Sequence, residues 1–89
     1  MAKRLYARYN GVDNDAEWNE FREAEKKGDL MVGELYVVEK VYMGRYQTEI
    51  KLQGINHLFN SVRFDFAVMK NGQLTAHHIQ NDKDYNPYL

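Results

Sequence analysis

Short segments of alternating apolar and polar residues, separated by glycine and asparagine, constrain this chain of 89 residues to a mainly β fold. The alternation is strictest in residues 46–52, where Tyr46 and every second residue after it are expected to face the core. Residues 3–9 alternate in the same way, and residues 33–43 form a longer apolar run. A bulge near residues 39–40 would keep the second half of that run in the core.

Residues 33–43 and 46–52 are joined by a short turn and should pair as an antiparallel hairpin. The C-terminal half contains the pattern of a second hairpin. Residues 62–68 alternate, with Val62 and the other even-numbered positions expected to face inward. The pair Asn71-Gly72 predicts a two-residue turn into a weaker strand over residues 73–79.

One segment changes period and predicts a single helix at about residues 14–27. Trp18, Phe21 and Ala24 recur every three residues and form a narrow apolar stripe, which is typical of a helix lying on a surface. Gly28 follows two lysines and is a typical helix end.

The strand predicted over residues 33–43 is apolar on both faces, because Leu35 and Val37 lie on the side opposite to its other apolar residues. We expect the Trp18 and Phe21 stripe to cover this Leu35–Val37 side. The result would be a rigid scaffold without a hollow suited to chemistry.

Composition excludes several classes of protein. The net charge is −1, from 12 Lys+Arg against 13 Asp+Glu, which disfavours a mainly electrostatic nucleic-acid binder and a polybasic membrane module. The absence of cysteine excludes disulfides, thiolate catalysis and cysteine zinc sites. No apolar run reaches the roughly 20 residues that span a bilayer, and the N-terminal residues do not read as a secretory signal. We therefore expect a cytoplasmic protein.

Catalytic and metal-binding motifs are missing from the sequence. There is no glycine-rich phosphate loop, no zinc-protease motif and no nucleophile elbow, so we expect no enzyme and no cofactor. His77 and His78 are adjacent on a predicted strand, where their side chains would point to opposite faces and could not chelate one ion.

The order of these elements resembles the small Src-homology-3-like barrel. Residues 4–9 look like its aromatic first strand, residues 32–38 its glycine-led second strand, and residues 57–64 its short helical turn and closing strand. The resemblance implies an α+β, mainly β fold: an antiparallel barrel with one amphipathic helix inserted after the first strand and a C-terminal β-hairpin arm. Residues 1–79 would form this domain and residues 80–89 an irregular tail.

Two departures from that family bear on ligand binding. A peptide-binding Src-homology-3 domain typically has a tryptophan at the start of its third strand, whereas Trp18 is the only tryptophan here. The closing turn, Asn60-Ser61, also lacks the typical proline. Polyproline binding is therefore not expected.

A second resemblance concerns origin. Residues 32–38, 44–52 and 59–66 are similar to small uncharacterised proteins of bacteriophages and mobile elements of Firmicutes. This implies a phage or prophage origin and no established activity. Many such proteins bind a host or phage protein and redirect or inhibit it.

We therefore interpret the chain as a non-enzymatic interaction module that binds and modulates a host or phage protein. Exposed tyrosines are typical of protein interfaces, and the acidic helix could contact a basic partner, although core tyrosines and a solvated helix face would explain the same residues. The candidate contact residues are Tyr6, Tyr42, Arg45, Tyr46, Glu17 and Glu20.

Two alternatives remain open. A small nucleic-acid-binding barrel would grip phosphates with basic residues while tyrosines stack on bases. Its candidate residues are Arg4, Arg8, Lys51 and Arg63. A homodimer would form if the arm at residues 67–79 paired across subunits.

Overall fold

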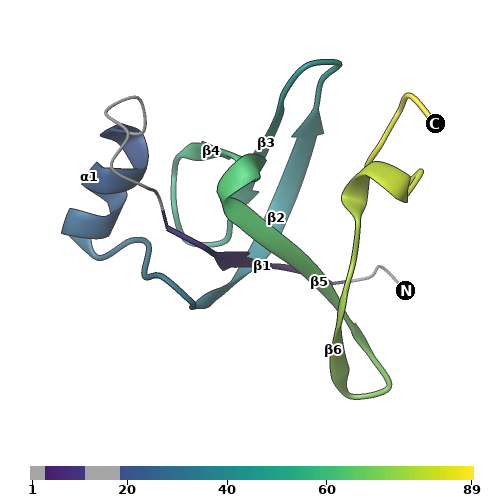
Figure 1. Ribbon diagram of the computed structural model, residues 1–89, viewed down its shortest axis with the longest axis horizontal. Helices are drawn as coiled ribbons and strands as arrows, with labels where there is room; N and C mark the ends of the chain where they lie inside the picture. The colour runs from purple at the N-terminus through teal and green to yellow at the C-terminus, as the bar shows by residue number, and fades with distance from the viewer. Residues whose placement is uncertain (1–3, 12–18) are drawn as a thin grey trace.

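The computed structural model describes residues 4–11 and 19–89, which form one antiparallel sheet of six strands (Figure 1). The strands are β1 (Leu5–Tyr9), β2 (Leu35–Met43), β3 (Thr48–Leu52), β4 (Leu58–Asn60), β5 (Phe64–Lys70) and β6 (Gln73–Ala76). They pair in the order β4-β3-β2-β1-β5-β6. No ladder joins β4 to β6 within these residues, so the sheet is not closed. The mainly β fold with a helix after the first strand is confirmed, and the Src-homology-3-like barrel stays a prediction. Three helical elements accompany the strands: the helix α1 (Asn19–Lys27), between β1 and β2, and the 3₁₀ turns η2 (Ser61–Arg63) and η3 (Ile79–Asn81).

The long strand β2 connects the two halves of the sheet. Its start pairs with β1 and its second half pairs with β3, with a register shift between Val38 and Lys40. This is the predicted bulge. It places Val41 opposite Ile50, where Val41 packs against the core.

The β5–β6 hairpin has the predicted turn. Asn71 and Gly72 have φ angles of 51° and 78°, the left-handed values that a two-residue turn of this kind needs. β6 is shorter than predicted, because it ends at Ala76 and the chain turns into η3 at Ile79.

An aromatic cluster holds α1 on the inner side of the sheet. The Phe21 ring stacks on those of Tyr9 and Phe59, with centroids 5.9 and 5.6 Å apart, and the Tyr9 ring lies 5.4 Å from that of Phe64. Tyr9 and Phe21 expose none of their surface. Burial of these rings attaches the helix to the sheet.

The prediction that the helix covers the Leu35–Val37 side of β2 is wrong. Leu35 pairs with Arg8 and Val37 with Tyr6, so both lie on the outer face, whereas Phe21 packs against Tyr9 on the inner face. The helix therefore packs on the larger apolar surface, which is the inner aromatic cluster. The predicted helix residues 14–18, including Trp18, lie outside the described residues.

Two residues expected in the core are exposed. Tyr46 exposes 99% of its surface because β3 begins only at Thr48. Val62 exposes 60% because it belongs to η2, where its backbone N–H donates to Asn60 Oδ1 at 3.0 Å. The alternation predicted β3 and β5 but placed the start of each strand two residues too early.

The C-terminal segment, residues 80–89, contains no strand and packs against the sheet. Ile79 is fully buried with Leu5 and Val68, and Tyr85 packs on the same cluster. In Figure 1 α1 lies at the left end of the sheet and this segment at the right end, and both pack on side chains of the inner face.

Alkaline pH should destabilise the protein through Tyr9. Its hydroxyl donates to Glu25 Oε2 at 2.7 Å, and burial, followed by this hydrogen bond, raises the pKa of Tyr9. An unfolded tyrosine ionises near pH 10, so the unfolded state loses this proton first. The free energy of unfolding should therefore fall above about pH 10, by up to about 1.4 kcal/mol per pH unit.

Tyr9→Phe tests this effect. The variant leaves the Glu25 carboxylate without its donor and should lose about 1–3 kcal/mol near pH 7. It should also show a shallower loss of stability than the natural protein when urea unfolding is compared between about pH 9 and pH 11. Equal pH slopes for the two proteins would contradict the role of the Tyr9 hydroxyl.

Candidate functional site

A groove with a volume of about 1130 Å³ lies between the end of the β2–β3 hairpin, η2 and the C-terminal segment. It separates the two sheet edges that do not pair, since β4 and η2 contribute to one wall and the end of β6 to the other. The structure therefore contains a groove, and the expectation that it has no hollow suited to chemistry stays a prediction. The lining comprises residues 43–48, 60–62, 64–66 and 76–78, together with Gln80, Asn86 and Tyr88.

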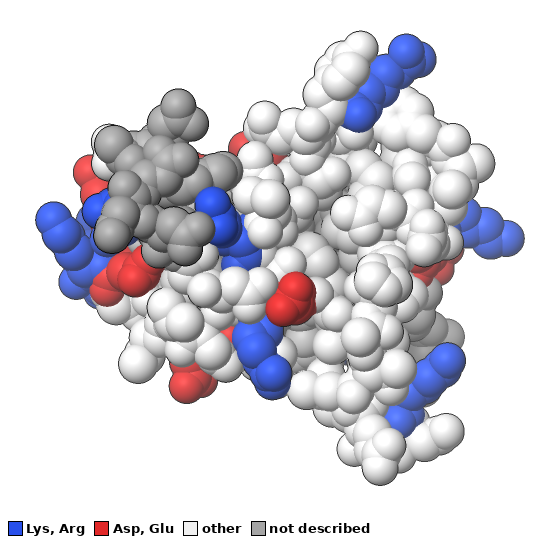
Figure 2. Space-filling model, viewed as in Figure 1, with Lys and Arg blue, Asp and Glu red and all other residues white. Residues whose placement is uncertain are grey.

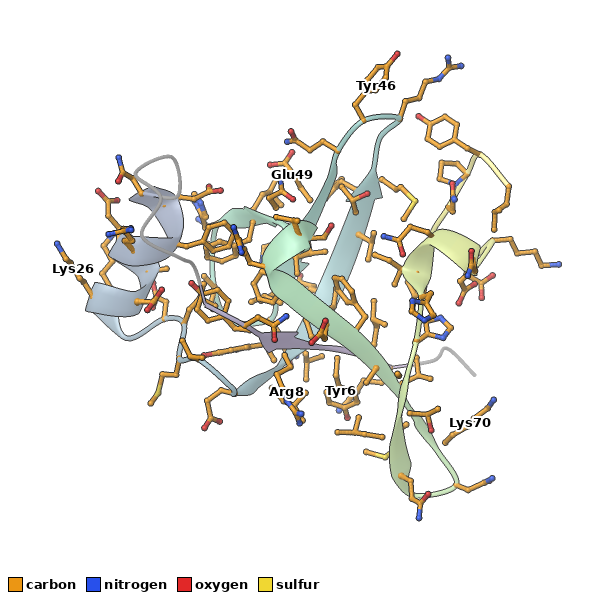
Figure 3. The ribbon with its side chains drawn as sticks, in the orientation of Figure 1. Tyr6, Arg8, Lys26, Tyr46, Glu49 and Lys70 are labelled. Atoms are coloured by element: carbon orange, nitrogen blue, oxygen red, sulfur yellow. The ribbon has the colours of Figure 1, made fainter. Side chains whose placement is uncertain are left out.

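The rim of the groove is aromatic and cationic. Tyr46 stands at the end of the β2–β3 hairpin and points away from the sheet (Figure 3). The neighbouring Arg45 places its guanidinium carbon 5.7 Å from the ring centre of Tyr88. This cation–π contact connects the hairpin end to the C-terminal segment across the groove.

Side-chain hydrogen bonds hold the C-terminal wall in place. His77 Nε2 donates to Asp82 Oδ2 at 2.8 Å, and the amide of Asn86 donates to the carbonyl of Gln80 at 2.7 Å. Asn86 Oδ1 in turn accepts from the backbone N–H of Tyr88 at 2.9 Å. These bonds fix the turns that present Tyr88 to Arg45.

Charge is sparse in the groove. Its lining contains one arginine, Arg45, and one acid, Asp65, besides the two adjacent histidines. Figure 2 shows most charged side chains of this face at the periphery and uncharged residues over much of its centre. Within residues 4–11 and 19–89 no group of three or more metal-ligating side chains is gathered. A mainly uncharged groove of this kind suits a protein segment better than a polyanion.

The structure brings two of the predicted contact residues together and separates the others. Arg45 and Tyr46 share the rim of the groove. Tyr42 lies on the same hairpin but does not line the groove, and the Nζ of Lys40 is 5.1 Å from its ring centre.

The remaining predicted contact residues lie elsewhere. Tyr6 is half-buried on the outer face between Val37 and Ala67, on the side of β1 to which Arg8 also points (Figure 3). Glu20 lies on α1, with its Oε2 3.2 Å from His57 Nε2. Glu17 lies outside the described residues.

The four residues of the nucleic-acid alternative are spread over both halves of the sheet. Arg8 pairs with Asp65 in the sheet register, and Lys51 donates to Glu39 Oε2 at 2.8 Å on β3, in the other half of the sheet. The charge of Arg63 lowers the pKa of Tyr9, but burial and Glu25 raise that pKa by more. Arg4 is exposed just before β1. Neighbouring acids therefore reduce the positive potential at two of these sites.

Sequence reasoning missed the C-terminal wall of the groove. Tyr88 was not a predicted contact residue, and residues 80–89 were expected to be irregular. A signal was present, because Asp82 and Asn86 are residue types that accept a hydrogen bond from the backbone two residues ahead. Both do so: Asp82 accepts from the backbone N–H of Asp84, and Asn86 accepts from that of Tyr88.

Comparison with known proteins places the chain among phage proteins. A model of the family described as Bacteriophage T4 protein Y07B matches residues 4–89. The chain belongs to the Y07B family. A relative from Enterobacteria phage T4, described as an uncharacterized 11.2 kDa protein in the segB-ipI intergenic region, is 31% identical over 64 residues, which are 72% of this chain and 67% of the relative. No solved structure matches the chain.

These matches support the phage origin predicted for this Y07B-family protein, while the Firmicutes host stays a prediction. The description of the T4 relative names no activity, so the comparisons add no chemistry to the groove. No helix in the described part of the chain is both long and apolar enough to cross a bilayer.

Proposed function

We propose that this Y07B-family protein is a non-enzymatic, cytoplasmic interaction module that binds a segment of a host or phage protein in the groove and thereby modulates that protein. One observation carries the proposal. Tyr46, with 99% of its surface exposed, stands beside Arg45 at the rim of a groove. Tyrosine and arginine contribute most to binding energy at protein interfaces, and a tyrosine gains contact area at a low entropy cost.

The lining supports a particular kind of segment. Met43, Val62 and Phe66 offer apolar surface, and Arg45 is the cation at the rim. A complementary segment would be extended, would insert an apolar or aromatic side chain, and would place an acidic group near Arg45.

The order of the elements supports a more specific description of the mainly β fold, namely a Src-homology-3-like barrel. β5, β1, β2, β3 and β4 follow one another across the sheet, a 3₁₀ turn separates β4 from β5, and α1 is inserted between β1 and β2. β6 and the C-terminal segment are additions to that order, and they supply the second wall of the groove.

A photo-crosslinking side chain at position 46 tests the proposal during infection of the host. We expect it to capture one defined protein, whereas the same group at position 42, an exposed tyrosine of the same hairpin outside the groove, should not capture it. With the purified pair, Tyr46→Ser should weaken binding about tenfold or more, and Tyr42→Ser should leave the affinity unchanged. Equal affinities for the two variants, or equal crosslinking at both positions, would contradict a role for the groove.

The nucleic-acid alternative has a separate test. Binding of short DNA or RNA that weakens steeply with salt, and weakens further in Arg8→Gln and Arg63→Gln, would favour it. We expect no binding at low salt, because the basic residues are dispersed and two of them lie beside acids.

A further inference from the structure

The strand β6 has one edge that no other strand pairs with among residues 4–11 and 19–89. Its other edge pairs with β5, in a register that runs from Lys70 opposite Gln73 at the turn to Ala67 opposite Ala76. In a hairpin with a two-residue turn, the pair beside the turn is hydrogen-bonded, and hydrogen-bonded and non-hydrogen-bonded pairs then alternate along the ladder. The hydrogen bond of 2.9 Å from the His77 N–H to the Phe66 carbonyl fits this alternation.

This alternation identifies the backbone groups on the free edge. Leu74 and Ala76 occupy the non-hydrogen-bonded positions, so their N–H and C=O groups point away from β5. No residue within 4–11 or 19–89 forms a hydrogen bond with them.

Although β6 has only four residues, its edge lacks the charges, the proline and the bulge that often prevent pairing with another strand. Gln73–Ala76 contains no charge and no proline, its register has no bulge, and all of its residues are exposed. Natural edge strands are normally protected by lysine, proline or a bulge. An unprotected edge in an otherwise charged protein points to a strand that binds there.

We propose that this strand is β6 of a second copy of the chain, paired antiparallel about a twofold axis at Thr75. Leu74 of each copy then forms a hydrogen-bonded pair with Ala76 of the other, and the two Thr75 residues face each other. This register uses only the outward backbone groups. It also keeps Leu74 and Ala76 of both copies on one face, so the strand is complementary to itself.

Charges at the two ends of β6 favour this arrangement. Lys70 lies at the hairpin end (Figure 3), while the segment after β6 carries Asp82 and Asp84 against Lys83. Antiparallel pairing brings the hairpin end of each copy beside the segment after β6 of the other. Lys70 of each copy then approaches a segment whose exposed acid is Asp84, since Asp82 is bonded to His77 within its own copy.

Apolar surface beside the edge favours the same arrangement. Met69 and Leu74 pair across the hairpin and expose 48% and 39% of their surfaces on the outer face. In the dimer, Leu74 of each copy lies beside Ala76 of the other, which removes part of this surface from water.

The mass in solution tests the dimer first. Light scattering during size-exclusion chromatography, with chain concentrations from about 1 μM to about 1 mM, should show a rise from 10.5 kDa to twice that mass. Leu74→Lys places a charge on the edge, and Ala76→Pro removes an outward donor without touching the ladder with β5. Each should raise the dissociation constant about tenfold or more, whereas Tyr46→Ser should not change it.

A single cysteine tests the register. The chain has no cysteine, and facing residues of a non-hydrogen-bonded pair lie about 4.5 Å apart at Cα, within reach of a disulfide. Thr75→Cys should therefore crosslink readily on mild oxidation, and Gln73→Cys should crosslink far more slowly.

Three results would overturn the proposal. The first is a monomer at every concentration, which would leave the edge for a strand of a different protein. The second is a dimer that neither edge variant weakens. The third is equal crosslinking of the Thr75→Cys and Gln73→Cys variants. Because Tyr46 takes no part in this edge, loss of the dimer and loss of binding in the groove are distinguishable.

Discussion

Replacing Phe21 with alanine should lower the free energy of unfolding by about 3–5 kcal/mol. The ring is completely buried and stacks on Tyr9 and Phe59, so its removal leaves a cavity between α1 and the inner face of the sheet. A domain of this kind has a total stability of roughly 5–15 kcal/mol, so the loss would be a large part of it. Urea unfolding followed by circular dichroism measures the change.

Two further variants of α1 serve as controls for this result. Phe21→Leu fills part of the cavity and should lose clearly less stability than the alanine variant. Glu23→Ala, on the exposed side of the helix, should change stability by no more than about 0.5 kcal/mol. A loss below about 1 kcal/mol for Phe21→Ala would show that the aromatic cluster does not hold the helix.

Local signals predicted the parts of the fold that local interactions determine. The turn at Asn71-Gly72 needs two left-handed residues, and these residue types adopt that conformation readily. The end of α1 was also predicted, and Gly28 has a φ of 81° there, with its N–H bonded to the Glu25 carbonyl at 3.1 Å.

Interactions between distant segments could not be predicted in the same way. The face of the sheet that α1 covers depends on Phe59 and Phe64, which lie far from Phe21 in the sequence and come together only when β4 and β5 are in place. The apolar character of Leu35 and Val37 suggested a cover on the other side. The periodicity of one strand indicates which residues share a face, but it does not indicate which face receives the helix.

The groove illustrates the same limit for the candidate site. Arg45 and Tyr46 were among the predicted contact residues, because exposed tyrosines are typical of protein interfaces, although the alternation of residues 46–52 placed Tyr46 in the core. Their relation to Tyr88 depends on how the C-terminal segment folds back, which no local pattern determined. The sequence therefore indicated half of the rim, and the tertiary structure supplied the rest.

Ile79→Ala should affect both stability and the groove. Ile79 is fully buried against Leu5 and Val68 and anchors the segment that follows it. We expect a loss of about 2–5 kcal/mol in the free energy of unfolding. Hydrogen exchange should also become faster in residues 80–89, because the segment loses its main apolar contact with the sheet.

The control for this variant is Leu89→Ala, since Leu89 lies on the same segment with 68% of its surface exposed. It should change stability by no more than about 0.5 kcal/mol and leave hydrogen exchange unaltered. If Ile79→Ala behaved like Leu89→Ala, the segment would not be held by the sheet and could not form a wall of the groove. If Ile79→Ala frees the segment while the sheet stays folded, the partner captured at position 46 should bind more weakly, because the contact between Arg45 and Tyr88 needs that wall in place.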